Sequence, residues 1–161
     1  MSISGLLAID IPAMLFATRA GFARSPFGTT VASIGSMREW VDQFEARTRR
    51  FSIDVVRLAR ALPRDPATWK VVDQLVAAAT SVGANHRAMR RARSDKEFAS
   101  KLFIVHEECD EAAHWLSMLA EISPSAAPHK EIARLAKEAV ELRNVFAAAR
   151  RTMRQRLGRK Q

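Results

Sequence analysis

The chain has 161 residues, 48% hydrophobic and 27% charged, which suits one globular domain and excludes a wholly disordered chain. Lys and Arg number 26 against 17 Asp and Glu, so the formal net charge is +9. This excess favours a polyanionic partner, either nucleic acid or an anionic membrane surface. The single cysteine, Cys109, excludes an intrachain disulfide framework and a multi-cysteine zinc site.

Residues 1–36 differ from the rest of the chain, because they hold only three charged residues and four of the six Gly. Their apolar run is interrupted by Asp10 and followed by Pro12, so it resembles neither a secretory signal nor a membrane span. We expect this segment to lie outside the fold, as an unstructured extension or a misassigned start, with Met37 as the candidate initiator. A weaker alternative is an acid-poor transit peptide.

From residue 37 onward, apolar residues recur every three or four positions, which predicts four amphipathic helices. Short polar or proline-containing segments mark their ends. The first predicted helix begins at a capping box, Ser36 and Glu39, and stops at Pro63. The second begins at an N-cap, Asp65 before Pro66, and ends near Arg91. The third begins at a second capping box, Ser94 and Glu97, and is followed by a linker at 123–128, after which the last helix ends near residue 157.

The predicted core follows from this spacing. Its residues in chain order are Trp40, Phe44, Phe51, Val55, Leu58 and Leu62; Trp69, Val72, Leu75, Val76, Ala79 and Val82; Phe98, Leu102, Val105, Cys109, Ala112, Leu116 and Leu119; and Ile132, Leu135, Ala139, Leu142, Phe146, Ala149 and Met153. Further apolar residues widen the middle helices, and they indicate either a self-association surface or a thick core. These are Leu75, Phe103, Ile104, Trp115 and Met118.

Helices of about 26 residues are roughly 40 Å long at 1.5 Å per residue. Because only a few residues connect them, neighbours must run antiparallel. The predicted fold is therefore all-α, an antiparallel up-down-up-down four-helix bundle over residues 37–157, followed by a basic tail at 158–161. We expect no membrane partner, because no exposed basic amphipathic helix stands apart from the bundle.

This topology gathers basic residues at one pole. Residues 86–101 hold six Lys or Arg and two acids, a net +4, and residues 143–161 hold seven and no acid. Residues 102–129, by contrast, contain no Lys or Arg and five acids. Arg dominates the basic segments, and its planar fork suits bidentate phosphate contacts. The candidate nucleic-acid-binding residues are Arg87, Arg90, Arg91, Arg93, Arg150, Arg151, Arg154 and Arg156. Alternatively, these arginines form a solvated face or pair with acids of a neighbouring subunit.

Catalytic and metal chemistry find little support. Glu111 and His114 form the E-x-x-H step of di-iron bundles, and His106 and Asp110 share that helical face, but no second E-x-x-H occurs. Cys109 lies on an apolar stripe, where a thiol packs as a small hydrophobe. Phosphate-binding glycine loops and nucleophile elbows are absent from the sequence. We therefore expect no catalytic residue, metal site or cofactor.

The run Ser81-Val-Gly-Ala-Asn85, followed by Ser94-x-x-Glu97-Phe98, resembles a signature of bacterial four-helix-bundle proteins related to the 23S ribosomal RNA intervening-sequence protein. The resemblance covers about residues 44–155. In this signature Gly83 would allow close helix approach, and Asn85 would bond to an adjacent helix or loop. The chain departs from the family at His86-Arg87, where many members have Ile-Ala-Glu, and this departure predicts added positive charge.

This resemblance implies a homo-oligomer, commonly a ring-shaped pentamer, without enzymatic activity. Members similar to it include the accessory protein of diversity-generating retroelements, which binds nucleic acid and a reverse transcriptase. Together with the basic pole, it predicts a cytoplasmic, non-catalytic nucleic-acid-binding or scaffold protein. The alternative is a protein–protein adaptor that docks an acidic partner, and a metal-dependent enzyme is the least favoured hypothesis.

Overall fold

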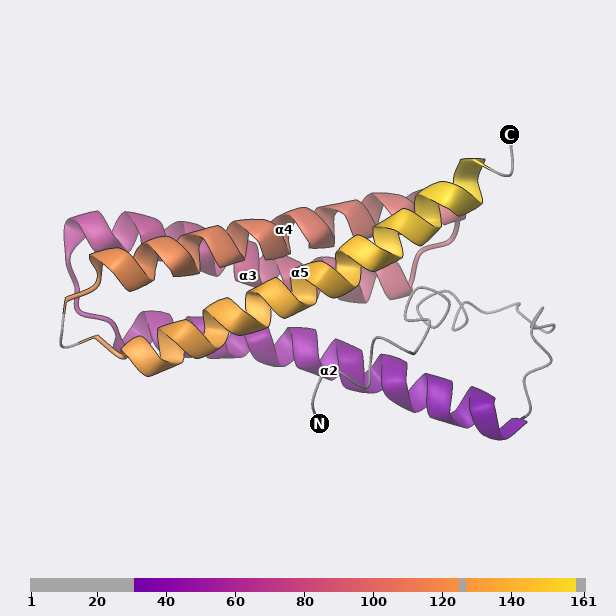
Figure 1. The fold of residues 1–161 in the computed structure, drawn as a ribbon, viewed down its shortest axis with the longest axis horizontal. Helices are drawn as coiled ribbons and strands as arrows, with labels where there is room; N and C mark the ends of the chain where they lie inside the picture. The colour runs from indigo at the N-terminus through magenta and orange to yellow at the C-terminus, as the bar shows by residue number, and fades with distance from the viewer. Residues whose placement is uncertain (1–30, 125–126, 159–161) are drawn as a thin grey trace.

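Residues 31–124 and 127–158 are described in a computed structural model of the chain, apart from the side chains of residues 31–38, 40 and 156. Within these residues the chain forms four helices and no strand (Figure 1). The helices are α2 (Val31–Ala61), α3 (Pro66–Arg90), α4 (Asp95–Ile122) and α5 (His129–Gly158). The sequence prediction of an all-α fold is confirmed.

The four helices pack antiparallel in sequence order. Figure 1 shows α3 beside both α2 and α4, while α5 crosses obliquely from α2 at its start to α4 at its end. Ion pairs follow the same path, because Arg134 of α5 contacts Asp54 of α2 at 2.9 Å, whereas Arg143 contacts Asp110 of α4 at 2.9 Å. The predicted up-down-up-down bundle is confirmed, and its connections are residues 62–65, 91–94 and 123–128.

Two predicted helix caps are confirmed by hydrogen bonds. The Asp65 carboxylate accepts from the Thr68 amide at 2.8 Å. The Ser94 hydroxyl accepts from the Glu97 amide at 3.0 Å, while the Glu97 carboxylate accepts from the Arg93 amide at 2.7 Å. Each cap satisfies amide groups that the helix itself leaves without partners and stabilises it by about 1 kcal/mol.

The predicted start of the first helix is wrong. The structure begins α2 at Val31, so Ser36 lies inside the helix instead of capping it. No proline occurs in residues 31–36, and a single Gly35 inside a helix costs only about 1 kcal/mol, so the local capping signal does not stop the helix. The expectations for residues 1–30, and for the tail residues 159–161, lie outside the described residues, and Met37 as initiator stays a prediction.

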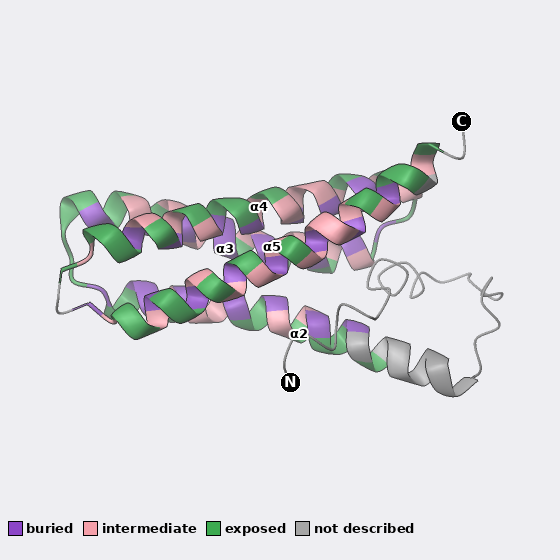
Figure 2. Cartoon of the chain, viewed as in Figure 1, coloured by how far each residue is buried: buried purple, intermediate pink, exposed green. Residues whose placement is uncertain are grey.

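The core runs the full length of the bundle (Figure 2). Every predicted inward residue of α4 and α5 is buried, from Phe98 to Leu119 and from Ile132 to Met153. Trp69 is a correction, because its side chain is 47% exposed. Thr68 and Val72 take the inward positions of the first turns of α3, and Trp69 lies about 100° around the helix from Thr68. The Trp40 side chain lies outside the described residues.

The apolar residues that widen the middle helices contribute to a thick core. Leu75 is fully part of it, and Phe103 and Trp115 pack against it while half-buried. Ile104 and Met118 are also half-buried. Leu75 therefore belongs to a thick core, as one of the two interpretations predicted. Self-association through the four half-buried residues stays a prediction.

Gly83 sets the distance between α2 and α3. A Cβ atom at this position would lie 2.7 Å from the Ser52 hydroxyl oxygen, closer than nonbonded atoms approach. That hydroxyl is engaged, because its oxygen lies 2.6 Å from the Ala79 carbonyl and 3.1 Å from the Thr48 carbonyl. The glycine thus permits the close helix approach that its place in the sequence signature suggested.

We expect Gly83→Ala to lower the free energy of unfolding by about 1 kcal/mol, because overpacking of about 1–3 kcal/mol exceeds the gain of about 1 kcal/mol in helix propensity. In a Ser52→Ala background the same substitution should become neutral or stabilising. Urea unfolding of the four variants of this double-mutant cycle measures the coupling. Equal effects of Gly83→Ala in both backgrounds would contradict the steric explanation.

Candidate nucleic-acid interface

The ends of α3 and α5 and the start of α4 lie at one end of the bundle, called here the basic pole (Figure 1). The predicted meeting of the two basic segments at one pole is therefore confirmed. Five arginines are exposed there, and none makes an ion pair with a carboxylate among the described residues. They are Arg87, Arg91, Arg93, Arg151 and Arg154.

Arg90 is not free, in contrast to its neighbours. Its guanidinium donates to the carboxylate of Glu45 and, at 2.9 Å, to that of Asp42, both on α2. Both carboxylates lie more than forty positions away in the sequence, so they are not counted in the net charge of residues 86–101. That net charge therefore overstates the positive charge that is available to a ligand. The predicted phosphate contact through Arg90 thus has to compete with two carboxylates.

Arg150 is also held within the protein. It donates to His106 Nδ1 of α4 at 2.9 Å and lies 3.9 Å from the Glu107 carboxylate. Its guanidinium carbon lies 4.6 Å from the centre of the Phe103 ring, and that of Arg154 lies 5.7 Å from it. The sequence analysis missed Phe103 as part of the site, because its proximity depends on the register of α4 against α5.

His106 accepts the Arg150 hydrogen bond as a neutral imidazole. Partial burial, and then the positive charge of Arg150, lower the pKa of His106. Nearby, Asp110 is paired with Arg143, and Glu107 lies beside Arg150. Part of the acidic stretch of α4 is therefore matched against α5 within one chain, which is an alternative to pairing with a neighbouring subunit.

The eight candidate arginines thus fall into different environments. Those of α3 and of the 91–94 connection share the basic pole with those of α5, and no contact within the described part of the chain joins the two groups. The Arg156 side chain lies outside the described residues, so its role stays a prediction. Among the candidate arginines whose side chains are described, Arg150 and Arg154 share a contact partner, the ring of Phe103.

Of the positive charge predicted at His86-Arg87, the exposed Arg87 supplies its part, but His86 does not. The ring is fully buried between Phe44 and Phe146, with ring centres 5.3 and 5.4 Å away. The pKa of His86 is lowered to about 4, mainly by burial; the negative charge of Glu45 opposes this shift, and the positive charge of Arg90 adds to it. Position 86 follows Ala79 and Val82 by seven and four residues, which keeps it on the inward face of α3.

The hydrogen bonding of His86 is incomplete. Its Nδ1 lies 2.9 Å from the buried Thr48 hydroxyl, which also lies 3.0 Å from the Glu45 carbonyl. Because the hydroxyl donates its proton to the Glu45 carbonyl, the neutral ring makes this contact as a donor, with its proton on Nδ1 and the hydroxyl oxygen accepting. Within the described residues, His86 Nε2 has no hydrogen-bond partner, so protonation of the ring would place an uncompensated charge in the core.

Asn85 joins α3 to α4 as expected. Its amide nitrogen donates within α3 to the carbonyl and hydroxyl oxygens of Ser81, at 3.1 and 2.9 Å. Its amide oxygen accepts from Lys101 of α4 at 3.3 Å. Lys101 is thereby turned toward the protein, and the residues of the signature act in packing and helix connection.

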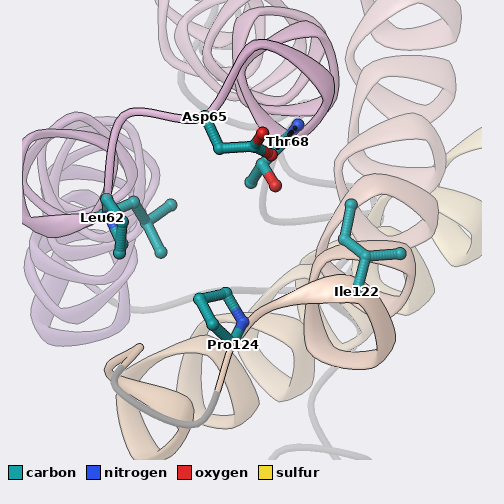
Figure 3. Close-up of a pocket in the computed structure, with 6 residues that line it drawn as sticks. Leu62, Asp65, Thr68, Ile122 and Pro124 are labelled. Carbon is teal, nitrogen blue, oxygen red and sulfur yellow. Dashed lines mark hydrogen bonds between the residues drawn. The ribbon is translucent and has the colours of Figure 1, made fainter.

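Other candidate sites carry little chemistry. No group of three His, Cys, Asp or Glu side chains in the described residues is arranged to hold a metal ion. Cys109 is buried, and burial raises the pKa of its thiol. A cavity of about 330 Å³ at the opposite pole is lined by Leu62, Pro63, Asp65, Thr68, Ile122 and Pro124 (Figure 3). Its only carboxylate, that of Asp65, already caps α3.

The four described helices lack the combination of length and apolarity that a membrane crossing requires. What they define is a helical bundle protein with a basic pole. A family described as 23S rRNA-intervening sequence protein matches residues 42–148, about two thirds of the chain. The chain belongs to this family, as its sequence signature indicated.

A solved structure has the same fold. It is a protein of unknown function from the S23 ribosomal protein family of Bacteroides thetaiotaomicron, with a TM-score of 0.58 and 22% sequence identity. The similarity covers 66% of this chain and 96% of that protein. No curated protein matches the sequence.

Acidification is expected to destabilise the fold through His86. The pKa of His86 is about 4 in the folded protein against 6.5 for an ordinary histidine. Between these two pH values the imidazole binds a proton in the unfolded chain but not in the folded one. The free energy of unfolding therefore decreases as the pH is lowered. The loss from about pH 7 to about pH 4 amounts to roughly 3 kcal/mol, and His106 adds to it in the same direction. Urea unfolding across this range measures it.

His86→Leu should make the fall shallower, because the leucine fills the same space and binds no proton. His114→Gln is the matched control: it removes an exposed histidine of α4 and leaves the buried ring in place, so the fall should persist. An unchanged pH dependence in His86→Leu would show that the buried imidazole is not responsible.

Proposed function

We propose that this protein is a non-catalytic, homo-oligomeric member of its family that binds nucleic-acid phosphates through the basic pole, acting as a scaffold in the cytoplasm. The observation that carries the proposal is the set of exposed arginines at this pole, which have no carboxylate partner in the described part of the chain. The family description names ribosomal RNA and is consistent with an RNA ligand.

Unpaired guanidinium groups suit this role. Arginine cannot be deprotonated in proteins and offers a planar fork to phosphate oxygens. Each phosphate contact releases counterions from the nucleic acid, so affinity should fall steeply with salt. Arg90 and Arg150, which are paired within the bundle, would mainly shape the surface, while the five exposed arginines make the direct contacts.

The alternative is a protein–protein adaptor whose basic pole docks an acidic partner. The same arginines would serve it, and the resemblance to the retroelement accessory protein makes a reverse transcriptase a candidate protein partner. The two hypotheses differ in what binds the purified protein. Direct binding of RNA or DNA favours the first, and complexes that survive nuclease treatment without such binding favour the second.

Replacing Arg87, Arg91, Arg93, Arg151 and Arg154 together by Gln should abolish most nucleic-acid binding. Filter binding against RNA and duplex DNA at several salt concentrations measures affinity and its salt dependence. The slope of log affinity against log salt should decrease by up to about 0.9 for each duplex phosphate that the protein no longer neutralises. The loss of affinity should be similar for different nucleotide sequences, because phosphate contacts carry no sequence information.

A matched control removes five exposed basic residues at and near the opposite pole: Arg60, Arg64, Lys70, Lys130 and Lys137. It lowers the net charge by the same amount, so it should retain the binding if location matters more than total charge. Equal losses of affinity in both variants would contradict a site at the basic pole, and absence of binding by the unmodified protein at low salt would refute the proposal.

Self-association is supported by apolar side chains that one copy leaves exposed. Trp69 and Ile122 are 47% and 45% exposed, and Ile122 lines the cavity at the opposite pole. Sedimentation analysis should give a multiple of the chain mass, with a pentamer expected from the resemblance. Trp69→Gln with Ile122→Gln should shift the protein toward the monomer. A monomeric unmodified protein at micromolar concentration would refute this part of the proposal.

A further inference from the structure

Phe103 occupies a distinctive position beside the basic pole. Part of its side chain packs against the core of the bundle, and the guanidinium groups of Arg150 and Arg154 lie near its ring. We propose that this ring is a stacking site for an unpaired nucleobase, so that the α4–α5 face takes single-stranded nucleic acid. This inference rests on the proposed function and names the ligand class of one part of its surface.

The two arginines differ in how firmly they are held. Arg150 lies over the ring at 4.6 Å and is held by the hydrogen bond to His106 and by Glu107, so it stays in place and the base takes the part of the ring that Arg154 covers. Arg154 is exposed, and within the described residues its contact is with the Phe103 ring at 5.7 Å. An exposed cation–π contact contributes about 0.5–1 kcal/mol, so Arg154 can leave the ring at little cost.

A nucleobase gains more from the ring than Arg154 gives up. Stacking of a base on an aromatic side chain is worth about 1–3 kcal/mol, which exceeds the cation–π contact that it would replace. The displaced guanidinium remains beside the base and can then contact the adjacent phosphate. Arg151 lies one turn earlier on α5, three positions from Arg154, and supplies a second phosphate contact on the same exposed part of the helix.

The surrounding charges orient the strand. On α4, Glu107 and Asp110 follow Phe103 in the direction away from the basic pole, and both carboxylates are largely exposed, at 69% and 61%. Because Glu107 lies beside Arg150 and Asp110 is paired with Arg143, that side of the ring offers phosphates no net positive charge. The sugar–phosphate backbone is therefore directed along the pole side, past Arg151 and Arg154, while the base turns inward to Phe103.

Whether a nucleic acid can use the Phe103 stacking site depends on whether its bases are paired. In a duplex the bases are stacked on one another and hydrogen-bonded across the helix, so the phosphates alone are accessible to the arginines without unstacking. A single strand can turn one base onto the ring at no such cost. The site thus adds a preference for unpaired nucleotides to the sequence-independent attraction of the basic pole.

The test compares fluorescence anisotropy of labelled oligo(U), oligo(dT) and a duplex of the same length with the full chain at low salt. Phe103→Leu keeps an apolar side chain in the helix and removes the aromatic face. Its affinity for both single strands should fall by about five- to hundredfold, with duplex affinity unchanged. The difference between oligo(U) and oligo(dT) reports whether RNA or DNA is preferred.

Two control variants separate stacking from charge and from general loss of an aromatic residue. Arg151→Gln should weaken single strands and duplex by similar factors. Trp115→Leu removes another half-buried aromatic residue of α4 and should keep the single-strand preference. Circular dichroism melting checks the fold. Should Phe103→Leu unfold, photocrosslinking of 5-bromouracil oligonucleotides to the unmodified chain replaces it, with the crosslink expected in the peptide that contains Phe103.

The outcomes distinguish this inference from the proposed function. If Phe103→Leu leaves single-strand affinity unchanged, lowers all three affinities equally, or the crosslink maps elsewhere, the stacking site is wrong while phosphate binding by the pole stands. If the unmodified protein binds none of the three oligonucleotides, both proposals fail.

Discussion

The pairing of arginines with carboxylates across helix interfaces decides which positive charges remain for a partner. Between α2 and α5, Arg47 donates to Glu138 and Glu141 at 2.6 Å each, and between α2 and α3, Arg90 donates to Glu45. These half-buried pairs hold both side chains in fixed geometry, unlike most exposed ion pairs, which contribute little. At the basic pole, the exposed arginines of α3, of the 91–94 connection and of α5 have no carboxylate partner within the described residues.

The same pairing reaches into the core. Glu45 connects the Arg90 ion pair with the buried His86. Its carboxylate binds Arg90, while its backbone carbonyl oxygen accepts from Thr48, which contacts His86. A buried neutral imidazole and a paired guanidinium thus lie on successive turns of α3. Protonation of His86 would place a second positive charge near Arg90, which is one reason why the pKa of this histidine is low.

Most of the fold could be predicted from the sequence, because helical periodicity and capping residues are local. The stripe from Phe98 to Leu119 and the caps at Asp65 and Ser94 are examples. Periodicity states which face of a helix is apolar, but not the register between helices. The partners of Arg90 and the position of Phe103 depend on that register. Residue type misleads at two positions of α3. The apolar Trp69 is exposed and the titratable His86 is buried, because the position of a residue on the helix decides which way it faces.

The net charge of the chain therefore overstates the number of arginines that are available to a phosphate. It also says nothing of the proposed preference for an unpaired base. An arginine that is already paired with a carboxylate neutralises no phosphate without first giving up that partner, so it adds little to the counterion release that drives non-specific binding. In the proposed function, the exposed arginines supply that release. Arg150 differs, because its hydrogen bond to His106 holds a positive charge over the Phe103 ring. In the proposed stacking site, fixed and free guanidinium groups around one aromatic ring account both for attraction to any polyanion and for a preference for an unpaired base.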